Sequence, residues 1–338
     1  MKTYLHIGTE KTATTSIQHF LSNNKELLSQ LGYIFPNDKG SNHTYLATAS
    51  AESFDKVKDL LIYQNIEKNT TQKGFYKEVK EYLMSLCEQQ NSESKKLILS
   101  NEHCSSRLTT LQEIKQLKDL LSAVATQTKV IIYLRKQDDY ITSLYSTYIK
   151  IGGTETFQNF LKYKEKEYRY NYEKILGLWT EVFGTENIII RLYEKESFFE
   201  GNIVLDFLKI IGIHKHSKFI FQSSKNKSMD TKSLEFLRNL NFHMPHFINQ
   251  KVNNERAKII DLLEQIPSTD IPITDSSLLQ QFYHNFSKSN TKVAEKYLGT
   301  SFLFEHKESS DIRKPESQNE IQDFFYLFSE LWKLNTKE

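Results

Sequence analysis

The sequence has few cysteines, almost no net charge and no long apolar run. Its 338 residues include only two cysteines, Cys87 and Cys104, which excludes a disulfide-stapled scaffold and is typical of a reducing compartment. A formal net charge of +2 gives no global argument for nucleic acid, so any basic patch has to be local. No stretch approaches the roughly 18 consecutive apolar residues of a membrane-spanning helix. We therefore expect a cytoplasmic protein with no nucleic-acid partner and no transmembrane segment.

The sequence also lacks the motifs of a metal site, of a repeat protein and of an apolar leader. No cluster of His, Cys, Asp and Glu has metal-ligand spacing, and we see no internal repeat or low-complexity tract. No apolar leader follows Met1, because a short strand begins almost at once. We expect a globular chain that requires no metal.

The most informative stretch is LHIGTEKTATTSIQHFL, residues 5–21. A short apolar strand runs into Gly8 and a loop that carries Lys11, and Ile17 and Phe20 then begin the apolar face of a helix. The loop and first-turn N–H groups have no intrahelical partners, and the helix dipole adds positive charge, so this arrangement predicts an anion site. The candidate anion-binding residues are Gly8, Lys11, Thr12, Ala13, Thr14, Thr15 and Ser16.

Strands and helices alternate through the first two thirds of the chain. Short apolar runs predict buried strands at residues 96–100, 129–134 and 187–192, and helical periodicity predicts helices at 137–149 and 172–183. This order predicts an α/β fold of the P-loop type, a parallel sheet flanked by helices, with helical additions in the C-terminal half. Ligands of such sheets bind beyond the carboxyl ends of the strands. Three of these strand ends carry the polar segments 8–16, 100–103 and Arg135.

The loop does not end in the Gly-Lys-Ser/Thr of nucleotide-triphosphate cradles, because Lys11 comes earlier and is followed by Thr-Ala-Thr-Thr. It resembles the 5′-phosphosulfate loop of sulfotransferases that use 3′-phosphoadenosine 5′-phosphosulfate (PAPS). Their pattern is Lys-x-Gly-Thr-Thr directly after a first strand. The chain departs once from this pattern, since Ala13 stands where the family has Gly. We expect a helical φ there, which Ala tolerates.

The same family places an Arg at the end of a central strand and a Ser eight positions later, and Arg135 and Ser143 have this spacing. A forked guanidinium and a hydroxyl fixed on a helix suit a phosphate dianion. The resemblance implies that Arg135 and Ser143 hold the 3′-phosphate of PAPS, the sulfuryl donor. It also implies that Lys11 neutralises the leaving oxygen. By analogy with a late basic loop of the family, we expect the donor to be covered by Lys225, Asn226 and Lys227.

Bacterial members of the family also resemble three later segments of this chain, although less specifically. These segments are residues 170–194, 223–241 and 289–299. The resemblance implies a sulfotransferase domain over residues 1–304. Within it we expect a PAPS-binding α/β core over about 1–220 and a helical acceptor or lid part over about 225–304. We expect residues 305–338 to form a polar linker and an amphipathic helix, for which we favour packing on its own domain over a dimer or membrane-surface contact.

An acceptor hydroxyl benefits from a general base. As candidates for this base we rank Glu102, which follows the predicted strand at residues 96–100, first, His43 second and His103 third. Glu10, inside the loop, is expected to be structural. Bacterial relatives of this type often modify glycans, so we expect a glycan or small-molecule acceptor. The basic residues around Arg169 alternate with glutamates, which favours a solvated helix face.

Two other functions fit parts of the pattern. A P-loop kinase or NTPase would need Mg²⁺ ligands and a Gly-Lys-Ser/Thr ending, and the sequence has no such ending. A non-catalytic nucleotide-binding scaffold is the second alternative, which Ala13 favours slightly and which Lys11 and Arg135 disfavour.

Overall fold

The computed structural model describes residues 1–88, 95–164, 167–214, 217–221, 229–248, 251–266, 273–274, 276–305 and 327–328. The chain forms two compact units, which we describe separately. The first comprises Met1–Arg135, Tyr168–Ser223 and Lys288–Phe304, and the second Lys136–Glu167, Ser224–Ser287 and Glu305–Glu338. The domain boundaries expected near residues 220 and 304 stay a prediction.

The first unit is built on a five-stranded sheet in the order β2-β3-β1-β4-β5, and every pairing is parallel. This confirms the α/β fold with a parallel sheet flanked by helices. Because β1 pairs with both β3 and β4, the carboxyl ends of these three strands lie side by side at one edge. The strands span β1 Lys2–His6, β2 Tyr33–Ile34, β3 Lys96–Ser100, β4 Gln127–Leu134 and β5 Ile188–Leu192.

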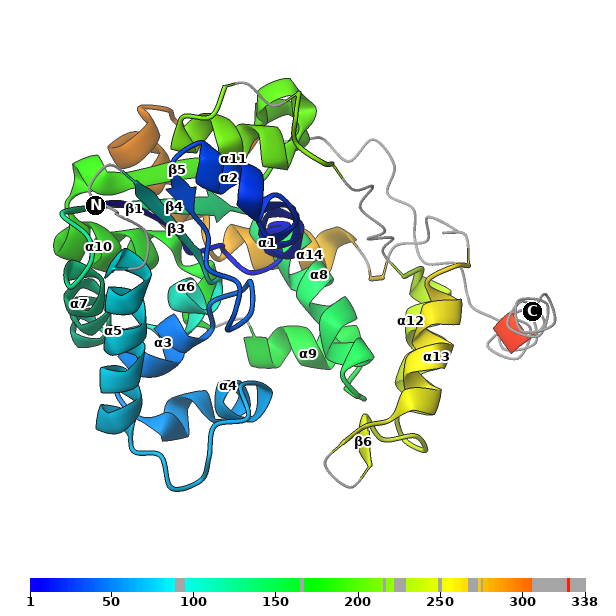
Figure 1. The fold of residues 1–338 in the computed structure, drawn as a ribbon. Helices are drawn as coiled ribbons and strands as arrows, with labels where there is room; N and C mark the ends of the chain where they lie inside the picture. The colour runs from blue at the N-terminus through cyan, green and yellow to red at the C-terminus, as the bar shows by residue number, and fades with distance from the viewer. Residues whose placement is uncertain are drawn as a thin grey trace. The chain divides into compact units, whose positions relative to one another are not determined.

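Helices cover both faces of this sheet (Figure 1). Between residues 54 and 88 the chain forms a 3₁₀ turn (Phe54–Val57) and the separate helices α4 and α5, and Asn65 takes a left-handed φ of 51° just after α4. The helices of this unit are α1 Thr14–Asn23, α2 Lys25–Gln30, α3 Tyr45–Ser50, α4 Lys58–Tyr63, α5 Gln72–Glu88, α6 His103–Arg107, α7 Leu111–Ser122, α10 Tyr172–Phe183 and α11 Ile203–Ile211. After α15 (Ser287–Val293) the chain makes a π-helical turn over Ala294–Leu298.

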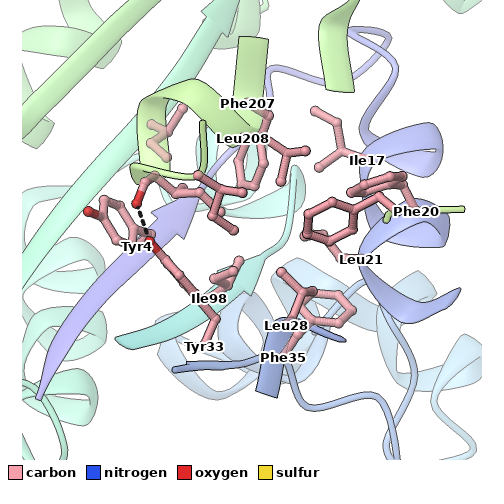
Figure 2. Close-up of a cluster of buried hydrophobic side chains, with 14 of the residues drawn as sticks. Tyr4, Ile17, Phe20, Leu21, Leu28, Tyr33, Phe35, Ile98, Phe207 and Leu208 are labelled. Atoms are coloured by element: carbon pink, nitrogen blue, oxygen red, sulfur yellow. Dashed lines mark hydrogen bonds between the residues drawn. The ribbon is translucent and has the colours of Figure 1, made fainter. Parts of the chain in front are cut away.

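A hydrophobic cluster fixes α1 and α11 against one face of the sheet (Figure 2). Tyr4 and Ile98 stand opposite each other on β1 and β3, and Phe20 and Phe207 pack over them from α1 and α11. The Tyr33 hydroxyl donates to the Ile211 carbonyl (2.8 Å), so the end of α11 is also held by a hydrogen bond. This packing sets the direction in which α1 leaves the sheet, and therefore the position of its N-terminus.

The second unit is helical, apart from a short antiparallel pair of strands. Its buried Arg256 donates to the Ile149 and Lys150 carbonyls at the end of α8 and to the Asn241 side chain. Asn241 in turn donates to the Ile149 and Gly153 carbonyls. These bonds satisfy terminal carbonyls that a helix leaves without partners. The elements are α8 Gln137–Lys150, α9 Phe157–Lys164, α12 Thr231–Leu240, β6 Phe247–Ile248, β7 Lys251–Val252, α13 Asn254–Leu263 and α14 Ser276–His284.

Candidate active site

The loop between β1 and α1 is anchored on the neighbouring strand β4. The Ile7 N–H donates to the Ile131 carbonyl (2.9 Å), and both the N–H and the hydroxyl of Thr9 donate to the Tyr133 carbonyl (2.8 and 3.1 Å). Inside the loop, the buried Thr12 hydroxyl donates to the Thr9 carbonyl (2.6 Å). Thr12 therefore shapes the loop with its side chain, and its hydroxyl is directed to a loop carbonyl.

Gly8 lets the end of β3 approach the start of this loop. Its φ of +87° favours glycine, and a Cβ at this position would lie 2.9 Å from the Glu102 Cβ and 3.0 Å from the Glu10 nitrogen. Both distances are shorter than ordinary contacts. Gly8 is therefore required for backbone conformation and for space, and Glu102 lies directly beside the loop.

Ala13 occupies the N-cap position of α1 in the left-handed region, at φ 56° and ψ 29°, with no side-chain cap. The expectation of a right-handed helical φ was wrong: the turn needs the conformation that the family's Gly adopts freely and that Ala adopts at a cost. The Ala13 carbonyl accepts from Ser16 and Ile17, so the N–H groups of Thr14 and Thr15 precede the first intrahelical bonds. The buried Thr14 and the exposed Thr15 thus stand at an uncapped, positively polarised helix end.

Arg135 joins this loop from the end of β4. Its Nη1 donates to the Lys11 carbonyl (2.6 Å), and its guanidinium carbon lies 5.3 Å from the centre of the Tyr193 ring. The Tyr172 hydroxyl donates to the Arg135 carbonyl and fixes the backbone there. The structure therefore brings together Lys11 and Arg135, which are far apart in the sequence.

Two further groups of residues were expected from the sequence to contact the sulfuryl donor. Ser143 lies half-buried on α8 in the second unit, so its role stays a prediction from the sequence spacing. The expected cover of the donor, Lys225, Asn226 and Lys227, lies outside the described residues. The C-terminal amphipathic helix expected after residue 318 also falls outside them, apart from residues 327–328.

Glu102 is held by a chain of buried polar groups. Gln18, on α1, donates from Nε2 to Glu102 Oε2 (3.0 Å) and to the Ser100 hydroxyl (3.1 Å). The Ser100 hydroxyl lies 2.9 Å from His6 Nδ1. Because burial lowers the pKa of His6 to about 3, its ring is neutral, and Nδ1 accepts the Ser100 proton when the ring proton is on Nε2. Sequence reasoning missed Gln18, whose only signal was a polar residue on the apolar face of α1.

His43 has a structural environment. It is fully buried, its Nε2 donates to the Pro36 carbonyl (2.6 Å), and its Nδ1 accepts from the Ser100 N–H (2.9 Å). Burial lowers the pKa of His43 to about 4, although the bond to Pro36 and the charge of Asp38 oppose this shift. With both ring nitrogens bonded to the backbone, His43 has no nitrogen to offer a substrate, and the structure argues against it as the base.

His103 and Glu10 belong to a buried charged cluster behind the loop. His103 Nδ1 lies 3.2 Å from Glu10 Oε1, and the Ser106 hydroxyl donates to the same oxygen (2.7 Å). Arg169 donates to the other oxygen, Oε2. Burial alone would raise the pKa of Glu10, but His103 and Arg169 outweigh it and hold this pKa well below its usual range. The expectation of a solvated face does not hold at Arg169, whose side chain is 15% exposed.

The described parts of the chain give two further findings. None of their helices combines the length and apolar character needed to cross a bilayer. None of their acidic, His or Cys side chains gather in a group of three or more that could ligate a metal ion.

Comparison with known proteins gives three similarities. No family model matches the chain. A relative from Archaeoglobus fulgidus, described as an uncharacterized protein, is 27% identical over 185 residues, which cover 52% of this chain and 48% of the relative. The chain thus spans about half the length of this curated relative. The crystal structure of a sulfotransferase from Alicyclobacillus acidocaldarius is similar at a TM-score of 0.43, with 15% identity over 65% of this chain and 85% of that chain. The sulfotransferase domain of the Synechococcus PCC 7002 olefin synthase is similar at a TM-score of 0.28, with 11% identity over 79% of this chain and 95% of that chain.

Proposed function

We propose that this protein is a sulfotransferase, which transfers a sulfuryl group from PAPS to a hydroxyl of an acceptor, a glycan or glycoconjugate. The observation that carries the proposal is the hydrogen bond from Arg135 to the Lys11 carbonyl. It supports the view that the two sequence motifs act as one clamp with two cationic groups. The uncapped end of α1 and Lys11 would take the 5′-phosphosulfate, and Arg135 the 3′-phosphate.

The chemistry needs a cation, aligned reactants and a proton acceptor. The acceptor oxygen attacks sulfur, an S–O bond forms, and the S–O bond to the 5′-phosphate breaks as adenosine 3′,5′-bisphosphate leaves. Lys11 would neutralise the charge that develops on the leaving oxygen. Glu102 lies beside Gly8 at the start of the same loop, and its carboxylate would take the proton of the acceptor hydroxyl. Such transfer is mostly positioning and electrostatics, and this mechanism requires no metal.

Ligand-induced thermal stabilisation separates this function from its alternatives. A ligand at about 100 times its Kd adds ~2.7 kcal/mol to stability. Stabilisation by adenosine 3′,5′-bisphosphate but not by Mg-ATP supports the proposal, whereas stabilisation by Mg-ATP alone would indicate a kinase or NTPase. A response to neither would favour a non-catalytic scaffold. Labelled PAPS and a panel of acceptors then test transfer, which Lys11→Ala should abolish while the protein stays folded.

Arg135→Ala tests the second half of the clamp. Loss of a charge-assisted bond costs roughly 1.5–3 kcal/mol, so binding of adenosine 3′,5′-bisphosphate should weaken about 10- to 100-fold. Binding of adenosine 5′-monophosphate, which lacks the 3′-phosphate, should weaken less, because it loses only the support that Arg135 gives to the loop through the Lys11 carbonyl. The matched control is Lys129→Ala at the opposite end of β4, where the side chain donates to the Glu186 carbonyl. Equal weakening of both nucleotides would show that Arg135 only shapes the loop.

A further inference from the structure

The first unit contains a cavity whose wall is bonded to the residue that follows β3. This cavity, which we call the α3–α5 cavity, has a volume of about 720 Å³ and is lined by α3, α5 and the segments that precede and connect them. Its size falls within the roughly 300–1,000 Å³ range of small-molecule sites. Its lining includes Asn42 and Thr44, which lead into α3.

The wall of this cavity is bonded to the residue that precedes Glu102. Asn101 donates from Nδ2 to the Asn42 carbonyl (2.7 Å), and the same nitrogen lies 3.5 Å from the Thr44 hydroxyl. Asn101 is itself fully buried, and its N–H donates to the His6 carbonyl (2.9 Å). The wall of the cavity is therefore tied by hydrogen bonds to the residue that precedes the proposed base.

The lining has the chemistry of a site for hydroxyl-rich molecules. It combines amide and hydroxyl side chains with the exposed ring of Tyr63, whereas the rings of Tyr45 and Phe75 are buried in the core. Tyr63 is 66% exposed, so its ring is presented at the opening rather than used in the core. Asn65, also in the lining, takes a left-handed φ of 51° just after the C-terminus of α4, a position where Asn commonly ends a helix. Amides pair with sugar hydroxyls, and aromatic rings pack against the apolar faces of sugars.

The charges around the cavity select against anionic ligands. Among the described residues that line the cavity, Lys39 carries the one ammonium and forms an ion pair with Glu78 (2.8 Å), which neutralises both. Glu67 is the other carboxylate of the lining, and it has no ion-pair partner among the residues described. The cavity therefore has a net negative charge, and at a surface such a charge disfavours a nearby anion by roughly fivefold.

We propose that the α3–α5 cavity binds the acceptor, and that this acceptor is an uncharged, hydroxyl-rich glycan rather than a sulfated or uronic-acid glycan. The proposal rests on the function proposed above, since it takes the bound glycan to be the acceptor of the sulfuryl group. It assigns Tyr63 as a packing surface for a sugar ring and Glu67 as the group that rejects anions.

The test measures glycan binding to the full chain without a donor, by saturation-transfer NMR and calorimetry. The neutral probes are N,N′-diacetylchitobiose, lactose, mannobiose and maltotriose, and the anionic probe is a hyaluronan tetrasaccharide. At least one neutral probe should bind with a Kd below about 10 mM, at least fivefold tighter than the anionic probe. Tyr63→Ala should weaken that binding about tenfold, whereas its matched control Ile62→Ala, 71% exposed and outside the lining, should not. Glu67→Lys should improve binding of the anionic probe at least fivefold.

Three results would overturn the inference: no binding of any neutral probe, equal binding of the anionic probe, or equal effects of Tyr63→Ala and Ile62→Ala. Stabilisation by adenosine 3′,5′-bisphosphate is measured on the same variants and should not change. Nucleotide binding without glycan binding would reject the cavity and leave the sulfotransferase function intact. Glycan binding without nucleotide binding would keep the cavity as a sugar site and reject the sulfotransferase.

Discussion

Replacing Arg169 with methionine should strongly destabilise the first unit, because it leaves the Glu10 carboxylate buried without its cation. Arg169 donates to Glu10 Oε2, and the side chains are 15% and 11% exposed. Removing one partner of a buried ion pair typically costs about 3–5 kcal/mol, most of it the penalty of an uncompensated charge. Replacing both partners, as in Glu10→Gln with Arg169→Met, removes that charge and should recover part of the loss.

The same carboxylate gives a pH dependence with a defined sign. His103 and Arg169 hold the pKa of Glu10 below its ordinary value of 4.5, so the unfolded chain binds its proton more readily than the folded chain. The stability that Glu10 contributes is therefore fully present above pH 4.5 and is lost as the pH falls below it. One such group changes the free energy of unfolding by at most about 1.4 kcal/mol per pH unit. Glu10→Gln should reduce the slope below pH 4.5 by up to this amount.

Urea unfolding between pH 3 and 7 measures both effects. Fluorescence of Trp179, fully buried on α10, reports on the first unit in a Trp332→Phe background. The matched control is Asp55→Asn, which breaks an exposed ion pair with Lys58 at 3.0 Å and should cost less than about 1 kcal/mol. The reasoning is refuted if Arg169→Met costs no more than this control at pH 7, or if Glu10→Gln leaves the acid slope unchanged.

Two further predictions concern the same loop and its neighbours. Ala13→Gly should stabilise the protein by up to about 1 kcal/mol, because relief of the left-handed Ala (about 1–2 kcal/mol) exceeds the entropy cost of Gly (about 0.4–1 kcal/mol). Thr15→Gly, in the right-handed first turn, is the control and should destabilise; equal losses from both would contradict the assigned strain. Gln18→Leu and Glu102→Leu should be non-additive in the free energy of unfolding by about 1.5–3 kcal/mol, because each removes the same charge-assisted hydrogen bond. A double mutant whose loss equals the sum of the single losses would show that this bond does not hold Glu102.

The sheet and its order of elements were predictable because they rest on local patterns. The apolar runs of β3 and β4 and the helical periodicity of α1, α8 and α10 are strong local signals. Parallel connections then place consecutive strand ends at one edge. This was enough to predict that Lys11, Glu102 and Arg135 gather at that edge. It was not enough to place the break between α4 and α5, where residues 64–71 leave the helix and Asn65 takes a left-handed φ.

The roles of individual polar residues were less predictable, because they depend on partners far away in sequence. His43 has no local feature that separates a base from a buried structural histidine; only the Pro36 carbonyl and the Ser100 N–H decide this. Arg169 lies among alternating charges that indicate a solvated face, yet the fold buries it against Glu10, 159 positions earlier in the chain. The partners that set these roles become visible only once the strands are assembled.

The conformation of the loop between β1 and α1 depends on hydrogen bonds within the loop and to the end of β4. Lys11 and Ala13 both take left-handed φ values, 65° and 56°, which cost non-glycine residues of order 1–3 kcal/mol each. Such a conformation persists only where surrounding bonds determine it, and here Arg135 holds the Lys11 carbonyl while Thr12 bonds back to Thr9. The strain is therefore maintained by the same guanidinium that the proposed function assigns to the 3′-phosphate. Under the proposed function, binding of the 3′-phosphate and the shape of the loop between β1 and α1 would thus be coupled through Arg135.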